Sequence, residues 1–221
     1  MNIINIEHIS KIFGDKVIFQ DASCGLQEGD KIGIIGINGT GKTTFLNILA
    51  GKEETDEGSV VRQNGIRLAY LTQHPEYAKE DTVFSFACKD TDESDWQAMS
   101  EVKSILNRLG FTDYEEKMEH LSGGQKKKAA LARTLAGNFD VLLLDEPTNH
   151  LDEAMLQWLE DYLNRFKGTV IMVTHDRYFL DRVSNRILEI SHGSIYSYEA
   201  NYSKFLELKA QREEMELASE R

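Results

Sequence analysis

The sequence predicts an α/β fold built on a mainly parallel sheet. Two continuous apolar runs, residues 141–144 and 169–173, are typical of strands that are covered on both faces. Helical patterns at residues 152–165 and 177–183 lie between and after them. Strands that alternate with helices in this way indicate a parallel α/β core. The 221 residues allow one large domain or two small ones, and a hydrophobic content of 41% is ordinary for a globular core.

Short strands and one helix are predicted in the N-terminal third of the chain. Apolar and polar residues alternate in the first thirty positions, as they do in half-buried strands. Gly51 stands where a helix C-cap glycine belongs. The predicted strands lie around residues 4–8, 17–22, 31–35 and 67–71, and the predicted helix at residues 43–50.

The middle of the chain is predicted to be a small helical subdomain. At residues 94–109, apolar side chains from Trp96 to Leu109 recur at spacings of three and four, and Ser94 with Gln97 is a candidate capping box. A second helix is expected at residues 123–136. We expect its cluster of three lysines, Lys126, Lys127 and Lys128, to form a solvated helical face.

The C-terminal part changes from a hairpin to a charged helix. Residues 186–190 and 194–198 are separated by His192 and Gly193 and predict a closing hairpin. Residues 202–221 are dense in Glu, Lys and Arg and predict a helix that stops without a cap. This pattern indicates a fragment or a longer polypeptide that continues past Arg221, and the alternative is a frayed C-terminal helix.

Residues 36–43 read Gly-Ile-Asn-Gly-Thr-Gly-Lys-Thr, a phosphate-binding loop of the form GxxxxGK[ST] between a predicted strand and a predicted helix. Its glycines let backbone N–H groups surround an anion, and the helix N-terminus adds positive partial charge. Lys42 supplies a cation for the β- and γ-phosphates, and the Thr43 hydroxyl is a ligand for Mg²⁺. The residues assigned to nucleotide binding here are Gly36, Asn38, Gly39, Thr40, Gly41, Lys42, Thr43 and Thr44.

Two further strands end in groups suited to hydrolysis. The run at 141–144 leads into Asp145, which is suited to hold the Mg²⁺ shell, and Glu146, which is suited to polarise the attacking water as general base. The strand at 169–173 delivers His175 to the same edge, where ligands of open α/β sheets bind. We expect His175 to reach the γ-phosphate.

Residues 121–125 read Leu-Ser-Gly-Gly-Gln and are identical to the signature loop of the ATP-binding cassette family. Residues 1–200 resemble that family's ATPase domain almost throughout. The resemblance implies ATP as the nucleotide and a P-loop NTPase core. It also implies an N-terminal antiparallel β subdomain and a helical subdomain at about residues 74–136.

The same resemblance assigns further site residues. Gln73 is similar to the family's Q-loop glutamine, a Mg²⁺ and water contact, His175 to its switch histidine, and Phe13 to an aromatic that stacks on adenine. In the family's arrangement the signature loop serves the ATP of an opposite cassette. The implied partner is therefore a second cassette, on the same polypeptide or in a homodimer. The signature residues assigned to that ATP are Ser122, Gly123, Gly124 and Gln125.

Within the family the chain resembles the ABC-F branch, which acts on ribosomes. Residues 145–152 and 174–181 are similar to that branch's forms of these segments, and residues 201–221 to the start of its interdomain linker. The resemblance implies the first cassette of a two-cassette translation or antibiotic-resistance factor that contacts ribosome, rRNA and tRNA through the full-length protein. Residues 73–121 leave little room for the arm insertion that many ABC-F proteins carry.

Two other readings compete with this one. The chain is alternatively the motor subunit of a membrane transporter, which would present a groove near Gln73 for a transmembrane coupling helix. A non-hydrolysing regulatory module is a third reading, and the intact Lys42, Asp145, Glu146 and His175 speak against it.

Composition limits the partners and the compartment. A net charge of −12 argues against a broad nucleic-acid-binding face. The apolar runs are far too short to span a bilayer, and no secretory signal is recognised. Cys24 and Cys88 form no metal or redox motif. We therefore expect a reduced, cytoplasmic setting without membrane insertion.

Overall fold

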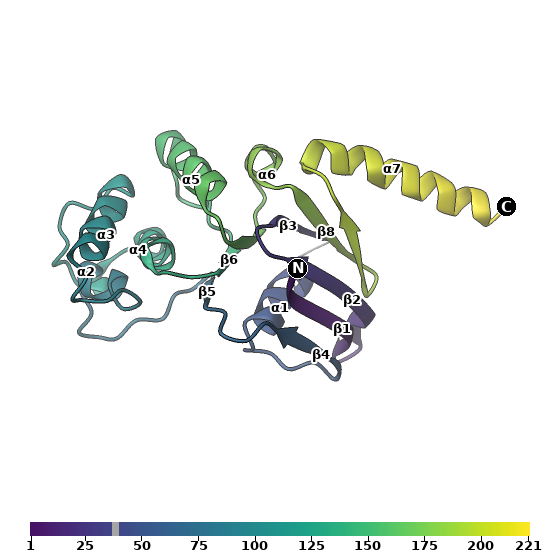
Figure 1. The fold of residues 1–221 in the computed structure, drawn as a ribbon, viewed down its shortest axis with the longest axis horizontal. Helices are drawn as coiled ribbons and strands as arrows, with labels where there is room; N and C mark the ends of the chain where they lie inside the picture. The colour runs from purple at the N-terminus through teal and green to yellow at the C-terminus, as the bar shows by residue number, and fades with distance from the viewer. Residues whose placement is uncertain (37–39) are drawn as a thin grey trace.

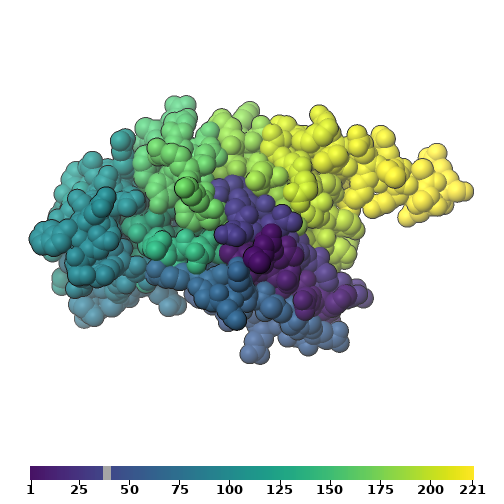
Figure 2. All heavy atoms as spheres, in the orientation of Figure 1, coloured from purple at the N-terminus to yellow at the C-terminus, as the bar shows by residue number. Residues whose placement is uncertain are grey.

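The computed structural model describes residues 1–36 and 40–221, and of Thr40 only the backbone. A central sheet separates two regions of different kind (Figure 1). A group of helices lies at one end of the molecule and a small antiparallel sheet lies below the other. The C-terminal helix projects beyond the body of the chain, which is also visible in the space-filling view (Figure 2).

The central sheet has six strands in the order β5-β6-β7-β3-β8-β9. The first five of these pair in parallel, and β9 pairs antiparallel with β8. This confirms the predicted α/β fold, its mainly parallel sheet and its closing hairpin. The strands are β3 (Lys31–Gly36), β5 (Leu68–Leu71), β6 (Val141–Asp145), β7 (Thr169–Val173), β8 (Arg186–Ser191) and β9 (Ser194–Tyr198).

A three-stranded antiparallel sheet forms the expected N-terminal β subdomain. Its order is β2-β1-β4, with β1 (Asn2–Phe13) in the middle. The outer strands are β2 (Lys16–Gln27) and β4 (Glu57–Arg62), and β4 is a strand that the sequence analysis did not predict.

Apolar side chains of the central strands point alternately into two cores. Leu143 and Ile171 pack with Phe45 of α1 (Thr40–Leu49) and with the β subdomain. Leu142 and Met172 pack with the helices on the opposite face. Burial on both faces explains why these strands read as continuous apolar runs and not as alternating ones.

Helices fill the middle and the end of the chain at the predicted places. The helical group is joined by an isolated bridge between Thr82 and Lys117. Among the described residues, no helix is both long and apolar enough to cross a bilayer. The helices are α2 (Val83–Ala87), α3 (Trp96–Arg108), the 3₁₀ helix η1 (Met118–His120), α4 (Gly123–Ala136), α5 (Glu153–Arg165), α6 (Arg177–Val183) and α7 (Tyr202–Ser219).

Two details of α3 differ from the prediction. Asp95 caps the helix by accepting from the N–H groups of Gln97 and Ala98, whereas Ser94 donates to Asp92. The predicted Ser94–Gln97 capping box is therefore wrong. Trp96 is 88% exposed, because it is the first residue of the helix and lies beyond the core that buries Val102 and the later apolar positions.

Candidate nucleotide-binding and catalytic site

A cavity of about 600 Å³ lies where β3, β6 and β7 end. It is the edge at which ligands of parallel α/β sheets bind, because each strand delivers the following residues there. The predicted site residues that line it are Gly36, Lys42, Thr43, Gln73, Glu146 and His175. The structure therefore gathers side chains from both halves of the chain into one site.

The phosphate side of the site is formed by the end of β3 and the first turn of α1. A Cβ atom on Gly36 would lie 2.9 Å from the Ile190 carbonyl oxygen, so this position accommodates only glycine without a backbone shift. Gly41 and Lys42 follow in the first turn of α1, and Thr44 is buried behind them. The predicted contacts Asn38, Gly39 and the Thr40 side chain lie outside the described residues.

Asp145 is the junction between three segments of the site. Its Oδ2 accepts from the Thr43 hydroxyl at 3.2 Å and its Oδ1 from the Gln73 amide at 3.5 Å. Burial raises the pKa of the Asp145 carboxyl, and Lys127, Thr43 and Gln73 oppose that rise. Hydroxyl, carboxylate and amide oxygens are the ligands that Mg²⁺ prefers, with substrate phosphates supplying the rest, so these three residues fit a shared Mg²⁺.

Glu146 is held in an unusual backbone conformation beside His175. Its φ angle is +53°, which costs a non-glycine residue about 1–3 kcal/mol and is common at functional sites. Its Oε1 lies 3.1 Å from His175 Nε2, and its Oε2 accepts from the His175 backbone N–H at 3.4 Å. Burial raises the pKa of Glu146, with His175 opposing the rise, and a raised pKa suits a general base near neutral pH.

The signature loop lies in a different place from the phosphate loop. Ser122 caps α4: its Oγ accepts from the Gln125 N–H at 3.2 Å, and its own N–H donates to the Gln125 side chain at 3.0 Å. Gly123 and Gly124 line a second cavity of about 540 Å³, which they share with Gln73 and Glu146 but not with Lys42 or Thr43. Ser122 and Gly123 are both exposed to solvent.

Phe13 is an exposed aromatic at the end of β1. The residue is 43% exposed, and the Lys11 ammonium lies 5.1 Å from the centroid of its ring. It is not among the residues that line the cavity. Its exposed ring keeps a face available for stacking, so the assignment of Phe13 to adenine remains a prediction.

One functional position was misjudged from the sequence. Lys127 was expected on a solvated face, yet it is 6% exposed and donates to the Thr72 carbonyl at 2.6 Å and the Asp145 carbonyl at 2.5 Å. Burial lowers its pKa to about 8, and Asp145 and Glu146 oppose that shift. Residues three and four positions apart share one face of a helix. Lys127 therefore shares a face with the apolar residues Ala130 and Leu131, which are both buried, and this spacing would have predicted its burial.

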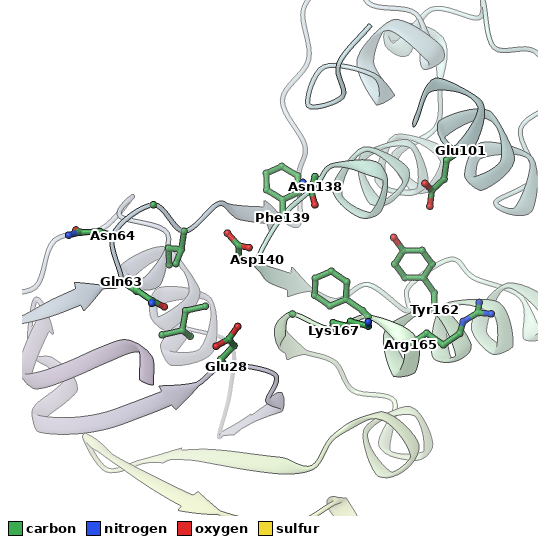
Figure 3. A pocket seen from close by; sticks show the side chains of 15 residues that line it. Glu28, Gln63, Asn64, Glu101, Asn138, Phe139, Asp140, Tyr162, Arg165 and Lys167 are labelled. Atoms are coloured by element: carbon green, nitrogen blue, oxygen red, sulfur yellow. The ribbon is translucent and has the colours of Figure 1, made fainter. Parts of the chain in front are cut away.

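A larger cavity, of about 760 Å³, lies at the other end of the strands (Figure 3). Asn138 and Asp140, which precede β6, and Lys167, which precedes β7, are among its lining residues. It is thus at the amino ends of the parallel strands, and Lys42, Thr43, Asp145 and Glu146 are not among its lining residues. Volume alone does not locate the reaction, and we assign the nucleotide to the smaller cavity.

A phosphate loop, a strand ending in Asp-Glu and a signature loop on one α/β core define an ATP-binding cassette ATPase. A family model described as ABC transporter matches residues 19–149, and the chain belongs to this family. The matched segment contains the phosphate loop, the signature loop, Asp145 and Glu146.

Curated relatives are similar along almost the whole chain. It is 38% identical to the uncharacterized ABC transporter ATP-binding protein YfmR of Bacillus subtilis, over 96% of this chain and 40% of that protein. It is 37% identical to the energy-dependent translational throttle protein EttA of Haemophilus influenzae, over 92% of this chain and 44% of that protein. The chain spans less than half the length of these relatives. The alignments extend over 251 and 250 positions, more than the 221 residues here, so the relatives carry insertions that this chain lacks.

Solved structures agree with the fold. One described as the ATP binding subunit of an ABC transporter superposes with a TM-score of 0.79 at 18% identity, covering 89% of this chain and 90% of its own. The ATP-binding cassette MJ0796 is described as a dimer in a post-hydrolysis state with ADP and Pi. It superposes with a TM-score of 0.72 at 22% identity, covering 89% of this chain and 98% of its own. At these identities the likeness concerns the fold.

Proposed function

We propose that the chain is the ATP-hydrolysing cassette of an ABC-F type protein that acts on the ribosome. The observation that carries the catalytic part is the convergence at one sheet edge. Thr43 and Gln73 both contact Asp145, and the neighbouring Glu146 is paired with His175. Lys42, Thr43 and the proposed general base Glu146 line one cavity, and the proposed metal-binding carboxylate, Asp145, lies directly behind it in contact with Thr43 and Gln73.

Each residue has a distinct role in the proposed reaction. Lys42 and the first turn of α1 bind the phosphates, and Thr43, Asp145 and Gln73 hold Mg²⁺, which neutralises phosphate charge when it is bound. Glu146 orients the attacking water and takes its proton, while His175 fixes the Glu146 carboxylate and reaches toward the γ-phosphate. The products are ADP and inorganic phosphate.

The second half of each site is proposed to come from another cassette. The Ser122 hydroxyl keeps its own proton as a donor, and the first N–H groups of α4 have no partner within the helix. Helix N-termini favour anions, so these groups suit a γ-phosphate presented by a partner. Residues 201–221 are proposed to begin the linker that joins the two cassettes.

The ribosomal role rests on the relatives. EttA, whose name places it in translation, is 34–37% identical in several species, in agreement with the ABC-F resemblance of residues 145–152 and 174–181. The test is co-sedimentation of the full-length protein with ribosomes in the presence of ATP. Glu146→Gln, combined with the equivalent change in a second cassette, should strengthen binding because hydrolysis no longer releases the complex.

A transporter motor is the second candidate, and one structural feature favours it. A groove of about 500 Å³ adjoins Gln73 and is lined by Tyr70, His74, Pro75, Phe86 and Arg133, where a coupling helix would dock. Co-purification with an integral membrane protein, with no ribosomes in the same preparation, would support this reading and contradict the first.

A further inference from the structure

The signature helix α4 reaches the catalytic edge through one buried lysine. We propose that Lys127 is a positioning residue for ATP hydrolysis, which holds the backbone that carries Glu146 and Gln73. The proposal rests on the catalytic role proposed above for Glu146.

Lys127 joins three elements at one ammonium group. It lies on α4, and its Nζ donates to the Thr72 carbonyl at the end of β5 and to the Asp145 carbonyl at the end of β6. Only 6% of the residue is exposed, so water does not replace these bonds when they break. A long stem with several donors is required to serve two carbonyls from a helix, and lysine provides it.

The bond to Asp145 fixes the peptide group next to the general base. This peptide links Asp145 to Glu146. Its carbonyl accepts from Lys127, and its N–H, that of Glu146, donates to the Val173 carbonyl at 2.7 Å. Both polar groups of the peptide are therefore held. Because Glu146 has a φ of +53°, a conformation that non-glycine residues rarely adopt, its surroundings must maintain it.

The hydrogen bond from Lys127 to the Thr72 carbonyl fixes the backbone directly before Gln73. The Gln73 amide reaches Asp145 Oδ1 at 3.5 Å, a long contact that depends on where the backbone places the side chain. One ammonium group thus sets the relative position of the two segments that meet at Asp145. Lys127 does not line the cavity of Lys42 and Thr43 but lines the second cavity, together with Gln73 and Glu146. We therefore expect it to act on hydrolysis, and not on the binding of ATP by Lys42 and Thr43.

The test compares Lys127→Met, which keeps the apolar stem and removes the donors, with Lys126→Met. The control residue is the preceding one on the same helix, and its ammonium lies 4.8 Å from the Tyr77 ring centroid. ATPase assays at high protein concentration should show kcat about tenfold or more lower for Lys127→Met. KM for MgATP should stay near that of the unaltered chain. Lys127→Arg, which retains donors, should recover part of kcat.

A second readout does not depend on turnover. Hydrogen–deuterium exchange of the peptide covering residues 141–150 should accelerate in Lys127→Met, because the peptide group between Asp145 and Glu146 loses one of its two hydrogen bonds. The exchange should not change in Lys126→Met. If Lys127→Met fails to fold, Lys127→Gln is assessed by the same measurements.

The proposal would be overturned if a folded Lys127→Met variant kept both its kcat and its exchange rate. It would also be overturned if the variant changed KM for MgATP and not kcat, or if Lys126→Met lowered kcat and accelerated exchange to the same extent. If the unaltered chain hydrolyses no ATP at any concentration, the proposed function fails, and the exchange comparison still decides the role of Lys127.

Discussion

Two regions of the chain, the carboxyl edge of the central sheet and the signature loop, carry groups that we assign to nucleotide binding. They differ in how many of these groups are already hydrogen-bonded within the chain. At the carboxyl edge of the central sheet, Asp145 is 1% exposed and accepts from two side chains, and Glu146 is held by His175. At the signature loop, Ser122 and Gly123 are exposed, and the contacts of Ser122 are those of its own capping box.

This difference supports the proposal that two molecules each contribute one part of every nucleotide site. The carboxylates at the sheet edge are already buried and hydrogen-bonded within one chain, which is the preorganisation that the proposed catalytic role requires. The signature loop is exposed and lines a different cavity from Lys42 and Thr43. We propose that a nucleotide bound at the sheet edge of one chain is completed by the signature loop of another.

The largest expected effect is at the general base. Glu146→Gln keeps the shape of the side chain and removes its ability to take a proton, so kcat should fall by about 10²- to 10⁴-fold. MgATP affinity, measured by calorimetry, should be unchanged. Wild-type turnover in this variant would show that another group activates the water.

Loss of the phosphate-loop cation should have the next largest effect. Lys42→Ala should weaken MgATP binding by about ten- to a hundredfold, the range for a hydrogen bond to a charged group. Lys52→Ala is the control, because Lys52 lies just beyond α1 and its ammonium contacts the Tyr70 ring at 5.3 Å. Equal affinities for Lys42→Ala and the unaltered chain would mean that the nucleotide binds elsewhere.

A smaller effect is expected at the exposed aromatic. Phe13→Ala should weaken MgATP binding by about five- to tenfold through lost base stacking, while binding of inorganic tripolyphosphate, which has no base, should not change. Ile12→Ala, another exposed apolar residue of the same hairpin, is the control. A parallel loss for tripolyphosphate would argue for a structural role of Phe13.

The sequence analysis succeeded where one local pattern determines the structure. The apolar runs of β6 and β7 carry their information in consecutive residues, and both strands were placed correctly. The strand β4 was missed because Glu57–Arg62 lies at the edge of the small sheet and is mostly exposed, so it shows no apolar alternation.

Lys127 shows a second kind of limit. Its burial depends on carbonyl groups 55 and 18 positions away in the sequence, which the composition of α4 does not reveal. Three consecutive lysines are usually a solvated face, and only the packing of α4 against β5 and β6 reverses this. Hydrogen-bond partners that are distant in the sequence are therefore the feature of the site that only the structure reveals.

The shared-site account is tested most directly by the mass of the Glu146→Gln chain in solution, measured by light scattering with MgATP and with MgADP. We expect a monomer of about 25.2 kDa with MgADP and a dimer with MgATP, since the γ-phosphate bridges the two chains and is no longer removed. Adding Ser122→Arg should abolish the dimer and leave MgATP affinity near normal. Full-rate ATPase activity from a strictly monomeric unaltered chain would contradict the account.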